Sequence, residues 1–221
     1  MPGSRPAPRS ARVVRRDERE RQLIGATLDC ISSLGLGDTT VQAVAARADM
    51  AVGSISQYFD SKSRLFTAVL EQLSVEFEAS WRAALAQAAP ESAARLGAFV
   101  GCYFLPSTCQ RKKVAVWFAF WGEVKARPQY QEVCEAYDRL HDETLEGLCA
   151  ALISEGGYEG LDARDVARLV ASMCHGLWLE LLTGRERLGR TELARLAAGG
   201  LAALFPRHAR ALAAQVVRQS A

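Results

Sequence analysis

Residues 26–70 read ATLDCISSLGLGDTTVQAVAARADMAVGSISQYFDSKSRLFTAVL, and this stretch decides the fold. Its apolar residues recur at three- and four-residue spacing, which predicts helices. Gly35 and Gly37 end a first helix, and Thr39 and Thr40 offer the N-cap of a second. The second helix is too short to be stable alone, so it must pack against a neighbour.

A third short helix is predicted from about Val52 to Phe59, after a tight break at Asp49 and Met50. Val52, Ile55 and Phe59 recur at helical spacing and are expected to face inward. The opposite side would then present small and polar residues, namely Gly53, Ser54, Ser56, Gln57 and Tyr58.

Two short helices joined by a tight turn are typical of the helix-turn-helix, whose second helix lies in the DNA major groove. Small residues allow the backbone to come close to DNA, Ser and Gln can bond base edges, and Tyr and Lys can bond phosphates. The alternative is an ordinary linking helix in which Tyr58 packs at the surface. Ser61 can then cap a fourth, longer helix with a continuous apolar face.

The charge is concentrated at the N-terminal end, although the whole chain of 221 residues carries a net charge of only +2. Residues 1–64 hold ten basic and seven acidic side chains, and residues 1–16 hold five arginines and no acid. A basic arm beside a folded unit commonly meets polyanions, although such an arm can also be only a solvated tail.

The opening stretch resembles, nearly position for position, the DNA-binding domain of the TetR family of bacterial repressors. The matching features are the threonine pair, the turn between Ala45 and Val52, and a YF-x-x-K signature that ends at Lys62. Asp49 stands where the family usually has glycine, and Asp tolerates a left-handed backbone, so the turn is expected to form. The resemblance implies DNA contacts from Arg16, Thr39, Thr40, Gly53, Ser54, Ser56, Gln57, Tyr58 and Lys62.

The fold class is predicted to be all-α, with about nine helices, because prolines only punctuate the chain and no β-type alternation occurs. We expect a disordered basic arm at 1–16, the helix-turn-helix at 17–64, a second helical domain at 65–206 and a tail at 207–221. The family resemblance implies that the second domain binds a small molecule and forms a homodimer through its last two long helices. The small residues Ala197, Ala198, Gly199, Gly200, Ala202 and Ala203 suit close helix contact, either between subunits or within the chain.

Aromatic residues form the densest chemical signal in the second domain. Residues 116–128 read VWFAFWGEVKARP, and a further tryptophan lies in HGLWLELL. Aromatic faces attract quaternary ammonium groups, and these segments resemble the BetI-type C-terminal domain of choline-responsive repressors. We therefore predict a ligand site at Trp117, Phe120, Trp121 and Trp178 for a choline-like cation, against the alternative that these residues only fill a core.

Sequence motifs of other protein classes are not found, which favours a regulator. The six cysteines lack the spacing of a zinc site and suggest buried thiols, and no metal site, cofactor or enzyme motif is predicted. No segment is long and apolar enough for a membrane span or a secretory signal, so a cytoplasmic protein is expected, on the nucleoid when bound to DNA. We predict a repressor that binds a palindromic DNA operator and is released by a small-molecule effector.

Two other interpretations stay open from the sequence. A redox or metal sensor on the same scaffold would use Cys102 and Cys109 as its trigger. A helical enzyme or adaptor with a vestigial helix-turn-helix would bind no specific DNA sequence.

Overall fold

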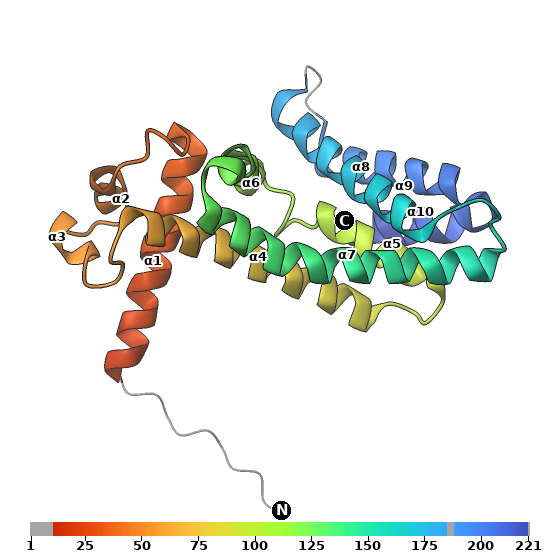
Figure 1. The fold of residues 1–221 in the computed structure, drawn as a ribbon, viewed down its shortest axis with the longest axis horizontal. Coiled ribbons are helices and arrows are strands. Elements are labelled where there is room, and N and C mark those ends of the chain that lie inside the picture. The colour runs from red at the N-terminus through yellow and green to blue at the C-terminus, as the bar shows by residue number, and fades with distance from the viewer. Residues whose placement is uncertain (1–10, 185–187, 221) are drawn as a thin grey trace, which may run out of the picture. The chain divides into compact units, whose positions relative to one another are not determined.

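The computed structural model describes residues 11–184 and 188–220, and every regular element in them is a helix (Figure 1). The predicted all-α fold is confirmed, with ten α-helices and three short 3₁₀ helices among the described residues, against the nine or so predicted. The chain divides into two compact units, one ending at Leu70 and the other beginning at Glu71.

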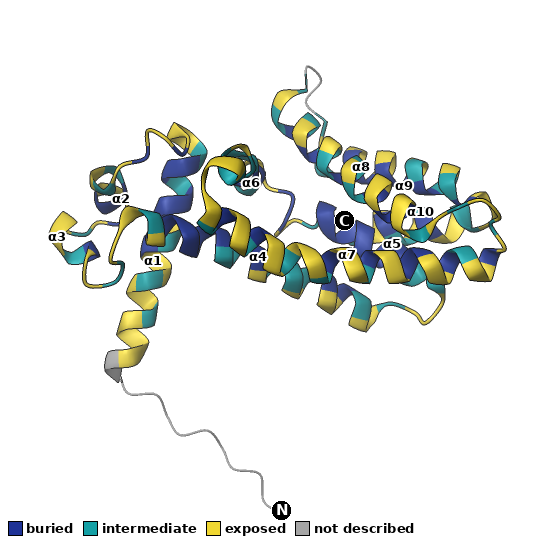
Figure 2. Cartoon of the chain, viewed as in Figure 1, coloured by how far each residue is buried: buried dark blue, intermediate teal, exposed yellow. Residues whose placement is uncertain are grey.

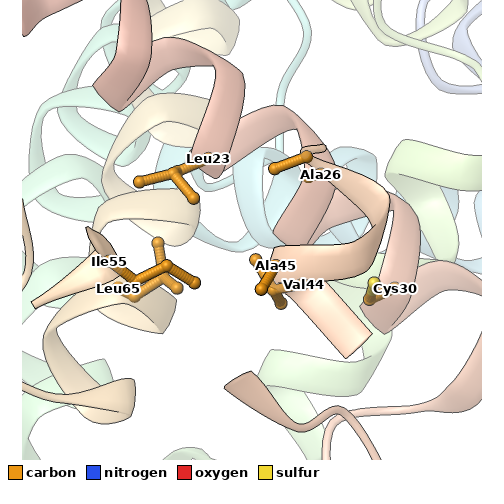
Figure 3. Packing of buried hydrophobic residues seen from close by; sticks show 8 residues of the cluster. Leu23, Ala26, Cys30, Val44, Ala45, Ile55 and Leu65 are labelled. Atoms are coloured by element: carbon orange, nitrogen blue, oxygen red, sulfur yellow. The ribbon is translucent and has the colours of Figure 1, made fainter. Parts of the chain in front are cut away.

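The first unit is the predicted three-helix domain together with the start of a fourth helix. Its helices are α1 (Ala11–Leu34), α2 (Val41–Arg47), α3 (Val52–Ile55) and the first turns of α4 (Lys62–Gln87). One apolar cluster joins all four and is made of Leu23, Ala26, Cys30, Val44, Ala45, Ala48, Ile55 and Leu65 (Figure 3). The two short helices are therefore stable because they share this core.

Three local signals in this unit work as predicted. The Thr40 side chain caps α2 by accepting a hydrogen bond from the Ala43 N–H at 3.1 Å. Asp49 adopts the left-handed conformation, with φ of 51°. The Ser61 hydroxyl oxygen accepts from the Arg64 N–H at 3.1 Å at the start of α4. Each break between helices is thus built by the residue that the sequence offers for it.

Helix α3 is shorter than predicted, because it ends at Ile55 and a turn follows over residues 56–58. Val52 was expected to face inward, but 45% of its surface is exposed. A single helical turn can direct only one residue squarely into the core, and that residue is Ile55, with 4% exposed. Tyr58 and Phe59 reach the same core from the turn and are half-buried.

The second unit consists of the rest of α4 and six further α-helices. These are α5 (Ser92–Gly101), α6 (Arg111–Glu123), α7 (Pro128–Gly156), α8 (Ala163–Thr183), α9 (Arg190–Leu204) and α10 (Ala209–Ser220). The short 3₁₀ helices are η1 (Cys102–Phe104), η2 (Val124–Ala126) and η3 (Pro206–His208). Helix α5 is buried along most of its length (Figure 2).

Glycines in α5 allow α10 to pack closely against it. A Cβ atom on Gly97 would lie 2.9 Å from Cβ of Gln215, and one on Gly101 would lie 2.7 Å from Cβ of Gln219. Neither approach is tolerated between real side chains, so these positions require glycine for this packing. Helix α10 is therefore an integral part of the second unit.

Two predicted boundaries are corrected by these helices. Residues 11–16 belong to α1 and not to a disordered arm, while residues 1–10 of that arm lie outside the described residues. The predicted tail at 207–221 is mostly α10, in which Leu212 and Val216 are fully buried. The spacing of these two residues by four marks an apolar helix face that the sequence analysis passed over.

We predict that Val216→Ala lowers the free energy of unfolding by roughly 2 kcal/mol, because it removes fully buried methyl groups and leaves a cavity. The neighbouring Val217→Ala is the matched control, since 38% of Val217 is exposed, and it should change the value by less than about 0.5 kcal/mol. Urea unfolding followed by circular dichroism measures both. Equal effects of the two substitutions would show that α10 is not packed as described.

Candidate nucleic-acid interface and ligand cavity

The first unit presents a polar surface around α3, on the side opposite to its buried residue. Ile55 is buried, whereas Gly53, Ser56 and Gln57 are exposed and Ser54 is partly exposed. A Cβ atom on Gly53 would meet nothing within 4 Å. This is the arrangement that a helix needs in order to bring its backbone and small side chains close to a DNA groove.

The two serine hydroxyls of this surface are held by local hydrogen bonds. Ser54 Oγ donates to the Ala51 carbonyl at 2.6 Å, and Ser56 Oγ donates to the Gly53 carbonyl at 2.9 Å. Each oxygen keeps its lone pairs, so it can accept a hydrogen bond from a base amino group without losing its own bond. The side chains are therefore oriented before any DNA arrives.

The other residues that were predicted to contact DNA differ in how far they are exposed. Lys62 is exposed, with Nζ 5.1 Å from the centre of the Phe66 ring, and Arg16 is exposed and paired with Glu20 at 2.9 Å. Thr40 is exposed, although its hydroxyl is used as the cap of α2. Tyr58 is half-buried against the core, so it combines packing with a partly exposed ring.

Thr39 is a correction to the predicted set. It is fully buried, and its hydroxyl donates to the Gly35 carbonyl at 2.7 Å. The side chain closes the loop between α1 and α2 and has no surface to offer to DNA. Thr39 therefore stabilises this loop and is not a DNA contact.

The second unit contains a cavity of about 700 Å³ between α4, η1, α6, α7 and α8. Three of the four predicted ligand residues line it, namely Trp117, Trp121 and Trp178. The sequence analysis missed the aromatic residues that other elements contribute, which are Phe77, Trp81, Tyr103 and Tyr137. The cavity is thus mainly aromatic on one side, as the predicted cation site requires.

Phe120 is the exception among the predicted ligand residues. It is fully buried, and its ring packs edge-on against Tyr130 at 4.9 Å between ring centres. Trp117 and Trp121 share one face of α6 because they are four residues apart, whereas Phe120 is rotated away from that face. Phe120 therefore belongs to the core and does not line the cavity.

The rings in the cavity wall are close enough to form one aromatic cluster. Trp121 lies 4.8 Å from the His175 ring and 5.7 Å from the Trp117 ring, measured between centres. Tyr103 lies 5.2 Å from Trp178 and 4.9 Å from Phe77. We call these six residues, Phe77, Tyr103, Trp117, Trp121, His175 and Trp178, the aromatic box.

Hydrogen bonds fix two members of the aromatic box. Trp178 Nε1 donates to the Tyr103 carbonyl at 2.9 Å, which ties α8 to η1. The Tyr103 hydroxyl lies 2.7 Å from His141 Nε2, and His141 Nδ1 lies 3.0 Å from Asp142 Oδ1. Burial raises the pKa of Tyr103 well above its ordinary value, so its hydroxyl stays protonated. An ionised Asp142 carboxylate can only accept, so the His141 Nδ1–H donates to it.

The charges at the aromatic box favour a cation. Burial lowers the pKa of His175 to about 4, so its ring is neutral at pH 7 and adds no positive charge. Asp138 and Asp142 line the cavity from α7, one helical turn apart. Burial, and then the negative charge of Asp142, raise the pKa of Asp138 to about 6, while His141 lowers it. Asp138 is therefore largely ionised at pH 7.5.

The acid–histidine–acid pattern was visible in the sequence but was not recognised. Asp138, His141 and Asp142 occupy one helix face at spacings of three and four. Phe77 and Tyr103 carried no such signal, because their approach depends on how α4 and η1 pack.

The six cysteines are buried, as predicted, and this disfavours the redox alternative. Burial raises the pKa of Cys102 to about 12 and that of Cys109 to about 11. The thiolate is the reactive form, so neither residue is a ready trigger at neutral pH. Within the described residues, no group of three or more His, Cys, Asp or Glu side chains could hold a metal ion.

Comparison with known proteins decides the family. The bacterial regulatory proteins of the tetR family match residues 23–69, and the C-terminal domain of BetI-type transcriptional repressors matches residues 90–206. The chain belongs to the TetR family of bacterial transcriptional regulators. Members of these families are regulators and not enzymes, so the enzyme interpretation is excluded.

Individual relatives agree with the family assignment. The regulator is 31% identical to the HTH-type transcriptional regulator BetI 2 of Chromohalobacter salexigens over 182 residues, which is 81% of this chain and 84% of that one. It is 30% identical to BetI of Escherichia coli K12 over 177 residues, covering 78% and 87% of the two chains.

Solved structures share the fold. A transcriptional regulator from Pseudomonas aeruginosa PAO1 matches with a TM-score of 0.75 and 25% identity over 88% of this chain and 93% of that one. A regulator from Saccharomonospora viridis, solved in complex with choline, matches with a TM-score of 0.75 and 17% identity over 84% and 96%. None of the described helices of the regulator meets the length and apolarity that a bilayer crossing requires.

We predict that Asp142→Asn lowers the pKa of Asp138 from its value of about 6, because it removes a nearby negative charge that favours the protonated form. Carbon-detected NMR of side-chain carboxyls across pH 4–8 measures the shift. Asp165→Asn, on α8 and outside the cavity lining, is the control and should leave the Asp138 titration unchanged. An unchanged titration in Asp142→Asn would contradict the described proximity.

Proposed function

We propose that this chain is a ligand-controlled repressor that binds a palindromic operator as a homodimer in the bacterial cytoplasm and is released by a small organic cation. The observation that carries the proposal is the burial of Ile55 beneath an exposed surface of small and polar residues on α3. The family assignment and the aromatic box support the regulatory and ligand-binding parts.

In this proposal some residues at the α3 surface contact bases and others contact phosphates. Ser54, Ser56 and Gln57 read base edges, and Gly53 allows the backbone to approach. Lys62, Tyr58 and Arg16 contact phosphates, which position the protein without reading sequence.

The homodimer is supported by exposed apolar residues on α8 and α9. Leu169, Leu179 and Leu196 are exposed by 54%, 44% and 48%. Cβ atoms on Gly176 and Gly199 would meet nothing within 4 Å, so these positions leave room for a second helix pair. Ala197 and Ala198 are buried within the chain. In this proposal the small residues of α9 therefore contact both the chain's own helices and the second subunit. A twofold dimer would present two α3 surfaces to half-sites about 34–36 Å apart.

The effector is proposed to bind its cationic group in the aromatic box. Each aromatic contact contributes about 0.5–2 kcal/mol to binding of a desolvated cation. Asp138 and Asp142 add attraction. The fold match with a regulator that holds choline makes choline one candidate.

Release from DNA is proposed to pass through α4. Phe77 and Trp81 of this helix line the cavity, and Glu76 bonds Lys113 of α6 at 2.7 Å. A cation that draws α6 and α4 into a new arrangement would tilt α4 and alter the separation of the two α3 surfaces. A coupling of about 1–3 kcal/mol between the two sites is typical and is enough for regulation.

We predict different effects of Gln57→Ala and Lys62→Ala on DNA binding. Loss of the base contact should relax sequence preference at one operator position by about 1–3 kcal/mol. Loss of the phosphate contact should weaken binding to all sequences alike. It should also reduce the slope of the logarithm of the binding constant against the logarithm of the salt concentration by about one. Fluorescence anisotropy with operator DNA selected from a random pool, and with single-base variants, measures both. If neither variant differs from the wild type, the assignment of the α3 surface to DNA is wrong.

We predict that Trp121→Leu weakens binding of choline by about 2- to 30-fold, since one cation–aromatic contact is worth about 0.5–2 kcal/mol. Tyr158→Leu is the matched control, because Tyr158 is a half-buried aromatic residue of the same unit that does not line the cavity and packs against Phe205. Calorimetric titration measures affinity, and DNA binding by both variants shows that they are folded. Equal affinities of the two variants would remove Trp121 from the site, and absence of binding by the wild type would remove choline from the candidates.

A further inference from the structure

The volume of the cavity exceeds what choline requires. Pockets of roughly 300–1,000 Å³ enclose drug-sized ligands, and this cavity of about 700 Å³ lies in the middle of that range. Choline would fill the aromatic box and leave the rest of the cavity to water. The side chains that line this remaining part therefore indicate what else the ligand carries.

The lining of α8 changes character along the helix. His175 and Trp178 belong to the aromatic box, whereas Arg168 lies two turns earlier and Arg164 one turn before that. Seven residues of α-helix span about 10 Å, so Arg168 begins about that far along the helix axis from His175. The lining from α8 thus has an aromatic end and an arginine end, while Arg139, Glu143 and Glu146 also line the cavity from α7.

The two arginines have no partner among the described residues. Neither guanidinium of Arg164 or Arg168 makes an ion pair or hydrogen bond there, and both side chains are exposed. Glu143 and Glu146 line the cavity from α7 but do not pair with them. Elsewhere in this unit, Arg82 and Arg127 are each paired with a glutamate. The guanidinium groups at the cavity are therefore available to a ligand.

The two ends differ in what they can bind. The aromatic end combines neutral rings with the carboxylates of Asp138 and Asp142, which suits a cation. A guanidinium binds carboxylate or phosphate with two parallel hydrogen bonds. A ligand that used both ends would carry two opposite charges.

We infer that the effector is a zwitterion, with a quaternary ammonium group in the aromatic box and an acidic group at Arg164 and Arg168. This inference rests on the proposed cation site and adds the second half of the ligand. It selects compounds that carry both charges. Simple cations would bind only through one end.

A matched pair of probes tests the inference, because γ-butyrobetaine and its carboxamide share the trimethylammonium group and the chain length and differ only in the acidic group. Calorimetric titration of the wild-type protein should show at least about tenfold tighter binding of γ-butyrobetaine. In the double variant Arg164→Gln, Arg168→Gln this ratio should fall close to one. Arg195→Gln, an exposed arginine of α9 outside the cavity, is the control and should keep the wild-type ratio.

The outcomes separate the inference from the proposed function. If the two probes bind the wild type equally, or if the double variant keeps the wild-type ratio, the zwitterion is overturned and the cation site stands. If neither probe nor choline binds while operator binding is intact, the cation site is wrong and the inference falls with it. Unfolding curves of the double variant confirm that any change in ratio comes from a folded protein.

Discussion

One continuous helix is the constraint on which the rest of the structure depends. Helix α4 contributes Leu65 to the core of the first unit, and it contributes Phe77 to the cavity wall of the second. Its 26 residues form an unbroken rod about 39 Å long. In the proposed function, a displacement at Phe77 would reach the first unit through this helix. The side chains of this one helix therefore have to pack in both units.

The contacts of α4 beside the cavity show how such a displacement could start. Burial acts to raise the pKa of Glu76, but hydrogen bonds from Lys113 and Gln72 hold it below its ordinary value. Glu76 is therefore ionised and bound to α6 at neutral pH. Arg111, two residues before Lys113, donates to the carbonyls of Leu181 and Leu182 near the end of α8. The start of α6 thus links α4 with α8, and Trp117 and Trp121 of α6 line the cavity.

The sequence predicted features that depend on neighbouring residues and missed those that depend on distant packing. Thr40, Asp49 and Ser61 act within three or four residues of their own position, so their roles could be predicted from local chemistry. Phe120 was misassigned because an aromatic run shows which residues are large but not which neighbour covers each face. Tyr103 was missed because its partners, His141 and Trp178, lie 38 and 75 residues away. The tryptophans of α6 and α8 were thus predictable from their own segments, whereas the residues that enter the cavity from α4 and η1 were not.

The strength of a ligand's binding and its ability to release DNA are separate matters. A ligand that bound the DNA-competent and DNA-incompetent arrangements equally would shift nothing, however tightly it bound. Trp178 and Tyr103 are buried and tied together by a hydrogen bond, so contacts with them change little between arrangements. Trp121 is only partly buried, and Phe77 lies on α4 itself. In the proposed function, the fixed rings would supply affinity, while the rings on α6 and α4 would supply the difference between the two states that regulation requires.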